Sequence, residues 1–219
     1  YTGRRFQEAL MRRLLFIIPL IVLSCSGVPV LKQGPAITNT MACESASIAR
    51  PIRLVHSIEA AFKGNRRAFM IGITVADPAK RTLESAIMSL EGLVLFQAKY
   101  GKAITVSRAV DLFSSPQFAE SMMDDIALML LPPQTGMSAL GTLRGSTVCR
   151  YGSGDEILDI AAGADSWKKM LYRGGKCVRT IKAWSFDERG IPAEMELVAR
   201  GESAYSLYLK LISAEDVAP

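Results

Sequence analysis

The sequence contains a single histidine, His56, among 219 residues. Hydrolytic triads and many metal sites depend on imidazole, so this scarcity removes the commonest general base and metal ligand. The four cysteines form no C-x-x-C pair, which leaves a thiol redox motif or a zinc site without support. There is no G-x-S-x-G elbow, and "RGGKC" lacks the upstream glycine and the hydroxyl residue of a phosphate-binding loop. His56 lies in an alternating segment and is interpreted as a packed or surface residue of a strand.

Two pairs of carboxylates are the remaining candidates for catalysis. Asp124 and Asp125 are adjacent on a predicted helix, where neighbours point about 100° apart, and they suit a solvated face. Glu194 and Glu196 share one face of a predicted strand and are typical of the polar side of an amphipathic strand. We therefore predict no catalytic residue, no metal and no cofactor. An enzyme stays a minor alternative that depends on Glu194 and Glu196.

Excess charge is also missing from most of the chain. Four of the 26 Lys and Arg and one of the 21 Asp and Glu precede Cys25, so 22 basic and 20 acidic residues remain. A body this close to neutrality gives no electrostatic reason to expect nucleic acid as a partner. Apolar residues make up 49% of the sequence, which predicts a substantial core in one compact domain.

The longest apolar run is Leu14 to Leu23, within "RRLLFIIPLIVLSC". Ten residues make a helix roughly 15 Å long, half of a hydrocarbon core of about 30 Å, so a membrane span is disfavoured. With Arg12 and Arg13 before it, the run is typical of a secretory signal. Met11 is the expected start, and residues 1–10 are interpreted as an upstream extension.

The end of this run, "VLSC", resembles the lipobox of bacterial lipoproteins. The resemblance implies cleavage before Cys25, diacylglycerol on its thiol and acylation of the new amino terminus, with palmitate as the expected chain. Multiple acyl chains at ~0.8 kcal/mol per buried methylene anchor a protein firmly. Ser26 favours the outer membrane, because an aspartate there would favour the inner one. We expect a leader at 1–24, a lipidated flexible tether at 25–50 and a domain at 51–215.

Lipidation of Cys25 would leave three cysteines, Cys43, Cys149 and Cys177. Three thiols cannot all pair within one chain. A bridge between Cys149 and Cys177 is one arrangement, and the sequence leaves the pairing open.

The body alternates short β-rich segments with turn residues, which predicts an antiparallel meander. In the segment 67–77, Phe69, Ile71 and Ile73 repeat with a period of two and indicate an apolar face directed at the core. The expected strands cover 53–62, 67–77, 82–90, 146–151, 156–161, 167–172, 177–185, 193–200 and 203–213, with a hairpin at 92–108.

One helix is expected between the two runs of strands. Ser115 is a good N-cap, Pro116 suits the first helical position, and Pro132-Pro133 ends the helix. Its apolar row should pack on the sheet, and its flexible methionines would fill a core or line a pocket that adapts to alkyl chains. The row and its neighbours are Phe118, Met122, Ile126, Leu130, Met123 and Met129.

"LESAIMSLEGLVLFQAKYGK", followed by an aspartate- and methionine-rich helix, resembles the LolA/LolB superfamily of periplasmic lipoprotein carriers and outer-membrane acceptors. It is most similar to uncharacterised LolB-like lipoproteins, over residues 52–213. The resemblance implies an α+β fold in which an antiparallel, unclosed half-barrel holds a helix on its concave apolar face, with acyl chains between them. By position it places Met88, Leu90, Leu93, Leu95 and Phe96 around one strand, where only alternate residues face the cavity.

We therefore expect a lipid-anchored envelope protein, at the outer membrane and facing the periplasm. It would bind acyl chains of lipoproteins or related lipids in a cavity of several hundred Å3, for transport or outer-membrane insertion. A periplasmic carrier protein is an expected partner. The alternative is a structural or assembly lipoprotein without catalysis, which an exposed apolar patch and no internal cavity would favour. The expected cavity residues are Phe69, Ile71, Ile73, Leu93, Leu95, Met122, Ile126 and Met129.

Overall fold

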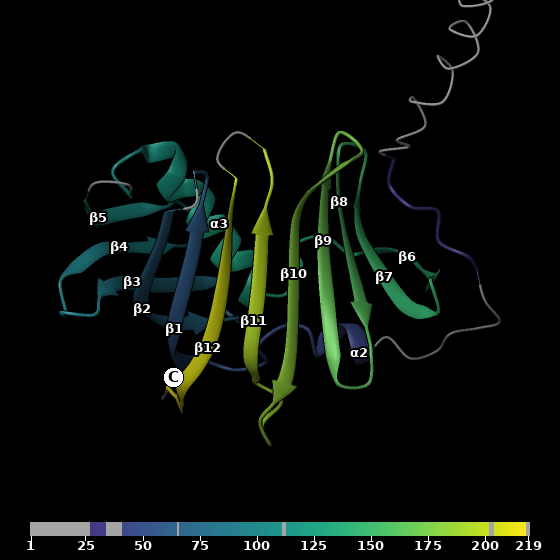
Figure 1. The fold of residues 1–219 in the computed structure, drawn as a ribbon. Coiled ribbons are helices and arrows are strands. Elements are labelled where there is room, and N and C mark those ends of the chain that lie inside the picture. Colours follow the sequence, from purple (N-terminus) through teal and green to yellow (C-terminus); the bar gives the residue numbers. More distant parts are fainter. Residues whose placement is uncertain (1–26, 34–40, 65, 111–112, 202–203, 218–219) are drawn as a thin grey trace, which may run out of the picture.

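The computed structural model describes residues 27–33, 41–64, 66–110, 113–201 and 204–217 (Figure 1). The predicted leader and Cys25 lie outside these residues. Among the described residues, no helix is both long enough and apolar enough to span a bilayer. The elements are α2 (Met41–Glu44), β1 (Ile52–Phe62), β2 (Arg66–Asp77), β3 (Thr82–Ser89), β4 (Val94–Tyr100), β5 (Thr105–Ala109), α3 (Pro116–Leu130), β6 (Met137–Leu143), β7 (Ser146–Ser153), β8 (Glu156–Ala162), β9 (Ser166–Arg173), β10 (Lys176–Phe186), β11 (Pro192–Ala199) and β12 (Tyr205–Asp216).

These strands form one open sheet of 12 strands in the order β5-β4-β3-β2-β1-β12-β11-β10-β9-β8-β7-β6. Every neighbouring pair is antiparallel. Two meanders, β1–β5 and β6–β12, meet where the first strand pairs with the last, with Phe62 opposite Tyr205. The predicted unclosed antiparallel sheet is confirmed. β6 lies in a stretch for which the sequence predicts no strand.

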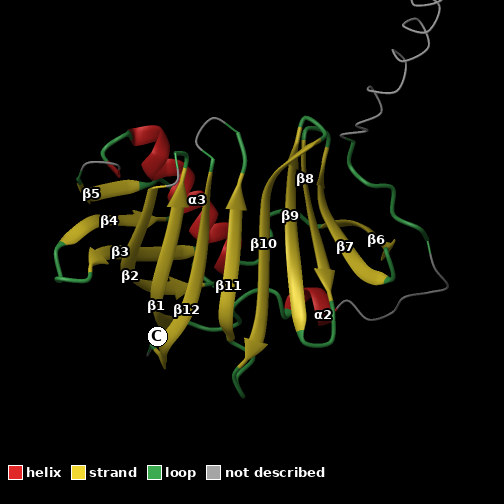
Figure 2. Cartoon of the chain, viewed as in Figure 1, coloured by secondary structure: helices red, strands yellow, loops and turns green. Residues whose placement is uncertain are grey.

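The helix α3 connects the two meanders and lies inside the curve of the sheet, behind β1, β12 and β11 in Figure 2. Its start is the predicted one: Ser115 is the N-cap, its hydroxyl accepts from the Phe118 amide at 3.5 Å, and Pro116 is the first helical residue. The inner face is apolar and buried, and it includes Met122, Met123, Ile126 and Met129 among its residues. The predicted packing of this helix on the concave face is confirmed.

The described residues of the N-terminal segment pack against the β6 end of the sheet. Lys32 forms a bridge with Thr142 of β6, and the Arg150 guanidinium donates to the Pro29 carbonyl at 2.8 Å. Further along, the Ile48 amide donates to the Leu130 carbonyl of α3 at 2.9 Å. Residues 41–50 are therefore held against the β domain, while the lipidated tether and the leader stay predictions.

A disulfide joins Cys43 to Cys149, and Cys177 is a free thiol. Cys149 shares the concave face of the sheet with Ile160, its register partner, whereas Cys177 is the second residue of β10, three strands away. Strands lie about 4.8 Å apart, so three spacings far exceed the 7 Å Cα separation that a disulfide tolerates. The bridge between Cys149 and Cys177 that the sequence left open is thus ruled out.

Candidate functional site

A cavity of about 50 Å3 lies between α3 and the concave face of β1, β2, β3, β11 and β12. The helix contributes Met122, Ile126 and Met129, so all three predicted helical residues line it. The sheet contributes two further methionines, Met70 and Met195. Four flexible thioether side chains therefore surround a small apolar space.

The sheet presents small residues to the helix at the cavity. Gly72, Thr74 and Ser85 line it, and a Cβ on Gly72 would lie 2.7 Å from Cδ1 of Ile58. The end of the Ile58 side chain therefore occupies the space above Gly72 and would have to shift if this residue were larger. Gly72, Thr74 and Ser85 thus form a part of the cavity wall with little side-chain volume.

The predicted orientation of β2 is wrong. Met70, Gly72 and Thr74 face the cavity, whereas Phe69, Ile71 and Ile73 lie on the opposite, convex face. The predicted alternation with a period of two is present in the burial of the strand. Phe69, Ile71 and Ile73, however, mark the outer face of this strand, and the inner face carries Met70, Gly72 and Thr74.

Leu93 and Leu95 also lie outside the cavity. Leu93 is in the turn between β3 and β4 and is 54% exposed, and Leu95 is half-buried at the margin of the core. Phe96 and Ala98 are the residues of β4 that point inward. A register shift between Ile87 and Met88 accompanies this change of face, and sequence spacing alone does not reveal such a shift.

Aromatic rings close one end of the cavity. Phe118 of α3 contacts Phe113 at a centroid distance of 6.0 Å and Tyr205 at 5.8 Å. Phe62 extends the cluster to β1, at 6.4 Å from Tyr205. Aromatic pairs at these distances are attractive beyond their burial, so this end of α3 is firmly packed.

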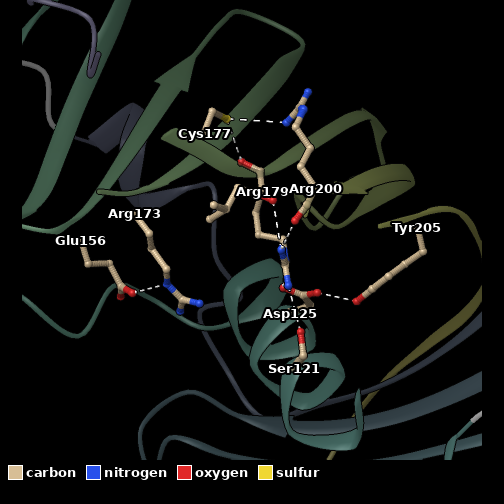
Figure 3. A network of polar contacts seen from close by, with 9 residues as sticks. Ser121, Asp125, Glu156, Arg173, Cys177, Arg179, Arg200 and Tyr205 are labelled. Carbon is tan, nitrogen blue, oxygen red and sulfur yellow. Dashed lines mark hydrogen bonds and ion pairs between the residues drawn. The ribbon is translucent and has the colours of Figure 1, made fainter. Parts of the chain in front are cut away.

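A buried ion pair fastens the middle of α3 to the sheet (Figure 3). Asp125 is 3% exposed, and its carboxylate accepts from Nε of Arg179 at 2.6 Å and from the Tyr205 hydroxyl. Arg179 also donates to the Ser121 hydroxyl at 2.9 Å. Burial raises the pKa of Asp125, an effect that the Arg179 charge and the Tyr205 hydrogen bond oppose. The prediction of a solvated face holds for Asp124, which is exposed, and is wrong for Asp125.

A second buried cation holds the C-terminal end of α3. The Lys169 ammonium donates to the carbonyls of Leu128 and Met129 at 2.9 and 3.3 Å and to the Ser47 hydroxyl at 3.3 Å. These carbonyls carry the negative end of the helix dipole. Burial lowers the pKa of Lys169 from 10.5 to about 7. No pattern in the sequence distinguishes Lys169 from the exposed lysines, so this contact is found only in the structure.

A larger recess of about 930 Å3 lies on the other side of α3, between the helix and β6–β9. Leu128, Leu158 and Leu171 contribute apolar surface, and charged residues such as Glu120 and Arg173 line its rim. Asp125 lines both the recess and the small cavity. The ion pair of Asp125 and Arg179 is therefore part of the wall between the two spaces.

The remaining candidates for chemistry are engaged in ordinary contacts. Glu194 accepts from the Trp184 indole at 2.9 Å and from the Tyr208 hydroxyl at 2.6 Å, and Glu196 forms an ion pair with Lys182 at 3.0 Å. Within the described residues, no group of three or more His, Cys, Asp or Glu is arranged to hold a metal.

No protein-family model and no curated protein matches the sequence. Among solved structures, a LolA superfamily protein from Nitrosomonas europaea, NE2245, has a TM-score of 0.53 at 9% identity, over 84% of this chain and 96% of that one. A domain from Vibrio parahaemolyticus, named for a proposed role in outer membrane lipoprotein sorting, has a TM-score of 0.45 at 7% identity, over 80% and 89%. The first match shows that the chain has the LolA/LolB-like fold, as the resemblance predicted.

Proposed function

We propose that this protein binds acyl chains of lipoproteins or related lipids between α3 and the sheet, and transfers them without catalysis. The observation that carries the proposal is the cavity beneath α3, with its lining of four methionines. Unbranched thioether side chains rearrange readily around flexible alkyl chains. The LolA/LolB-like fold, in a chain that resembles lipoprotein carriers and acceptors, supports the same interpretation.

We propose that the small cavity is a closed form of the site. Its cavity of about 50 Å3 is far below the roughly 300–1,000 Å3 of most ligand sites. Outward movement of α3 would separate Asp125 from Arg179 and join the cavity to the recess of about 930 Å3. The combined space would then suit a lipid chain.

The energies favour such an opening. Breaking a buried ion pair costs about 3–5 kcal/mol. An acyl chain with about 14 buried methylenes, at ~0.8 kcal/mol each, would gain ~11 kcal/mol. Burial of one chain therefore exceeds the cost of releasing the helix. Part of this free energy is spent on opening the site, so net binding is weaker. A carrier needs such moderate affinity in order to release its cargo.

Lipid co-purification from the full-length protein tests the proposal. We expect stoichiometric acyl lipids by mass spectrometry, and more of them in Asp125→Asn, which releases α3. Asp124→Asn is the matched control, because this neighbour is exposed and has no part in the ion pair. A protein free of lipid in all three forms would contradict acyl binding.

We further propose that Cys25 carries the lipid anchor and that the protein faces the periplasm from the outer membrane, where a periplasmic carrier would deliver its cargo. Only Ser26 separates Cys25 from Gly27, the first described residue, so the anchor would lie near the β6 end of the sheet. Cys25→Ser should move the protein from the membrane fraction to the soluble fraction. Retention of this variant in the outer membrane would contradict the anchor.

A second function, assembly with a partner protein, is favoured by an exposed apolar patch. Phe69, Leu90 and Leu93 are 59%, 66% and 54% exposed. They lie close together because Met70, next to Phe69, pairs with Ser89, next to Leu90. If assembly is the function, Phe69→Ser with Leu93→Ser should abolish the interaction and leave lipid content unchanged. If transport is the function, Asp125→Asn changes lipid content.

A further inference from the structure

The cavity wall contains a group of three polar residues, His56, Thr74 and Ser85, which we call the polar patch. They come from three neighbouring strands of the concave face: His56 is opposite Gly72, and Thr74 is opposite Ser85. All three are buried and line the cavity. The other polar lining residues, Asp125 and Tyr205, are hydrogen-bonded to each other.

The polar patch has unused hydrogen-bonding capacity. His56 is 5% exposed, and its Nε2 atom is buried without a partner in the described part of the chain. The hydroxyls of Thr74 and Ser85 are 3.2 Å apart, so one donates to the other and one hydroxyl hydrogen remains available. Buried polar atoms in proteins are almost always hydrogen-bonded, so an unpaired nitrogen beside a cavity indicates a missing partner.

We propose that the polar patch binds an uncharged oxygen of an acyl lipid, a hydroxyl or an ester carbonyl, through Nε2 of His56. This inference rests on the proposed function, since the lipid would enter the same cavity. A hydroxyl satisfies either tautomer of the imidazole, because it both donates and accepts. An ester carbonyl requires the tautomer with hydrogen on Nε2.

The environment of the patch disfavours a charged group. Burial lowers the pKa of His56 to about 4, so the imidazole is neutral at pH 7 and offers no positive charge to a carboxylate. No Lys or Arg lines the cavity among the described residues, and Arg179, the partner of the lining residue Asp125, is already paired. A carboxylate in this apolar space would lose its hydration without compensation. Alcohols and esters of acyl chains are therefore preferred over ionised fatty acids.

The test compares three probes of equal chain length, 1-decanol, n-decane and decanoate, on the full-length protein at pH 7. The key quantity is the ratio of 1-decanol to n-decane affinity in each variant, because the cost of removing each probe from water cancels between variants. We expect His56→Leu to lower this ratio about fivefold to tenfold, as the loss of one net hydrogen bond does. Ile58→Leu is the matched control, because it lines the same cavity from the same strand and changes no polar atom.

The variant should fold, since leucine removes a buried polar atom that has no partner in the described structure. His56 is also the only histidine in the chain, so its two ring nitrogens, Nδ1 and Nε2, give the only pair of imidazole 15N signals. We expect the Nε2 resonance to shift with 1-decanol and to remain unchanged with n-decane.

The outcomes separate the two proposals. If no probe binds to any form, acyl binding itself fails, and this inference fails with it. If n-decane binds but the affinity ratio is the same in wild type and His56→Leu, only the inference is overturned, and water alone occupies the patch. Tighter binding of decanoate than of 1-decanol would overturn the preference for uncharged oxygen.

Discussion

Replacement of Asp125 by asparagine tests the central contact between α3 and the sheet. The side chains of Asp125 and Arg179 are 5% and 13% exposed. If one partner were removed, water would therefore hydrate the remaining charge only weakly. Asparagine keeps the shape of the side chain and removes its charge, which leaves the Arg179 guanidinium buried and unpaired. Removing one partner of a buried ion pair costs about 3–5 kcal/mol. In a domain of this size, such a loss lowers the melting temperature by roughly 6–20 °C.

Urea denaturation followed by circular dichroism measures this loss. Asp124→Asn should change the free energy of unfolding by no more than about 0.5 kcal/mol, as exposed substitutions do. Asp125→Asn combined with Arg179→Met should recover part of the loss, because no buried charge remains unpaired. If Asp125→Asn costs less than ~1 kcal/mol, or if the double variant is no more stable than the single one, the ion pair does not hold the helix.

Three further predictions concern other described contacts. The disulfide closes a loop with a sequence separation of 106. Cys43→Ser should therefore lower stability by up to about 4–5 kcal/mol in denaturation under oxidising conditions, and should show no further loss on addition of reductant. The pKa of Lys169 is about 7 when folded and 10.5 when unfolded, so stability should rise between these pH values, because only the unfolded chain keeps the proton. Lys169→Met should remove that rise. The pKa of His56 falls from 6.5 to about 4 on folding, so acidification through this window should cost up to ~3 kcal/mol in wild type but not in His56→Leu. A stability difference between these two proteins that does not change between pH 7 and pH 4 would contradict the buried, neutral imidazole.

Local signals predicted much of the fold. Ser115 and Pro116 mark the start of α3, and the row through Met122 and Ile126 identifies its buried face. Turn residues such as Gly64 separate the strands, and its φ of 78° is one that glycine adopts without strain. These features depend on residues that are close together in the sequence, so they can be read without a structure.

The parts that were missed depend on distant residues. Asp125 is 54 residues from Arg179 and 80 from Tyr205, and nothing in its local sequence distinguishes it from Asp124. The apolar pattern of β2 predicts the wrong face, because the inner face carries Gly72 and Thr74, which give no apolar signal, while Phe69, Ile71 and Ile73 lie on the outer face. The disulfide partner of Cys149 likewise depends on the tertiary fold. Cys43 lies beside Cys149 because the N-terminal segment packs along the β6 end of the sheet.

The pairing of the first strand with the last has a consequence for how the chain folds. Arg53 of β1 contacts Glu215 of β12, 162 residues later. Until β12 exists, β1 has an unpaired edge and β11 has another, so an incomplete chain carries two edges that promote aggregation. Closing so large a loop is slow. β12 must also pair with β1 and with β11 before the two meanders form one sheet. We therefore expect the last 12 residues of the sheet to set the folding rate, and C-terminal truncations to aggregate rather than yield a smaller stable domain.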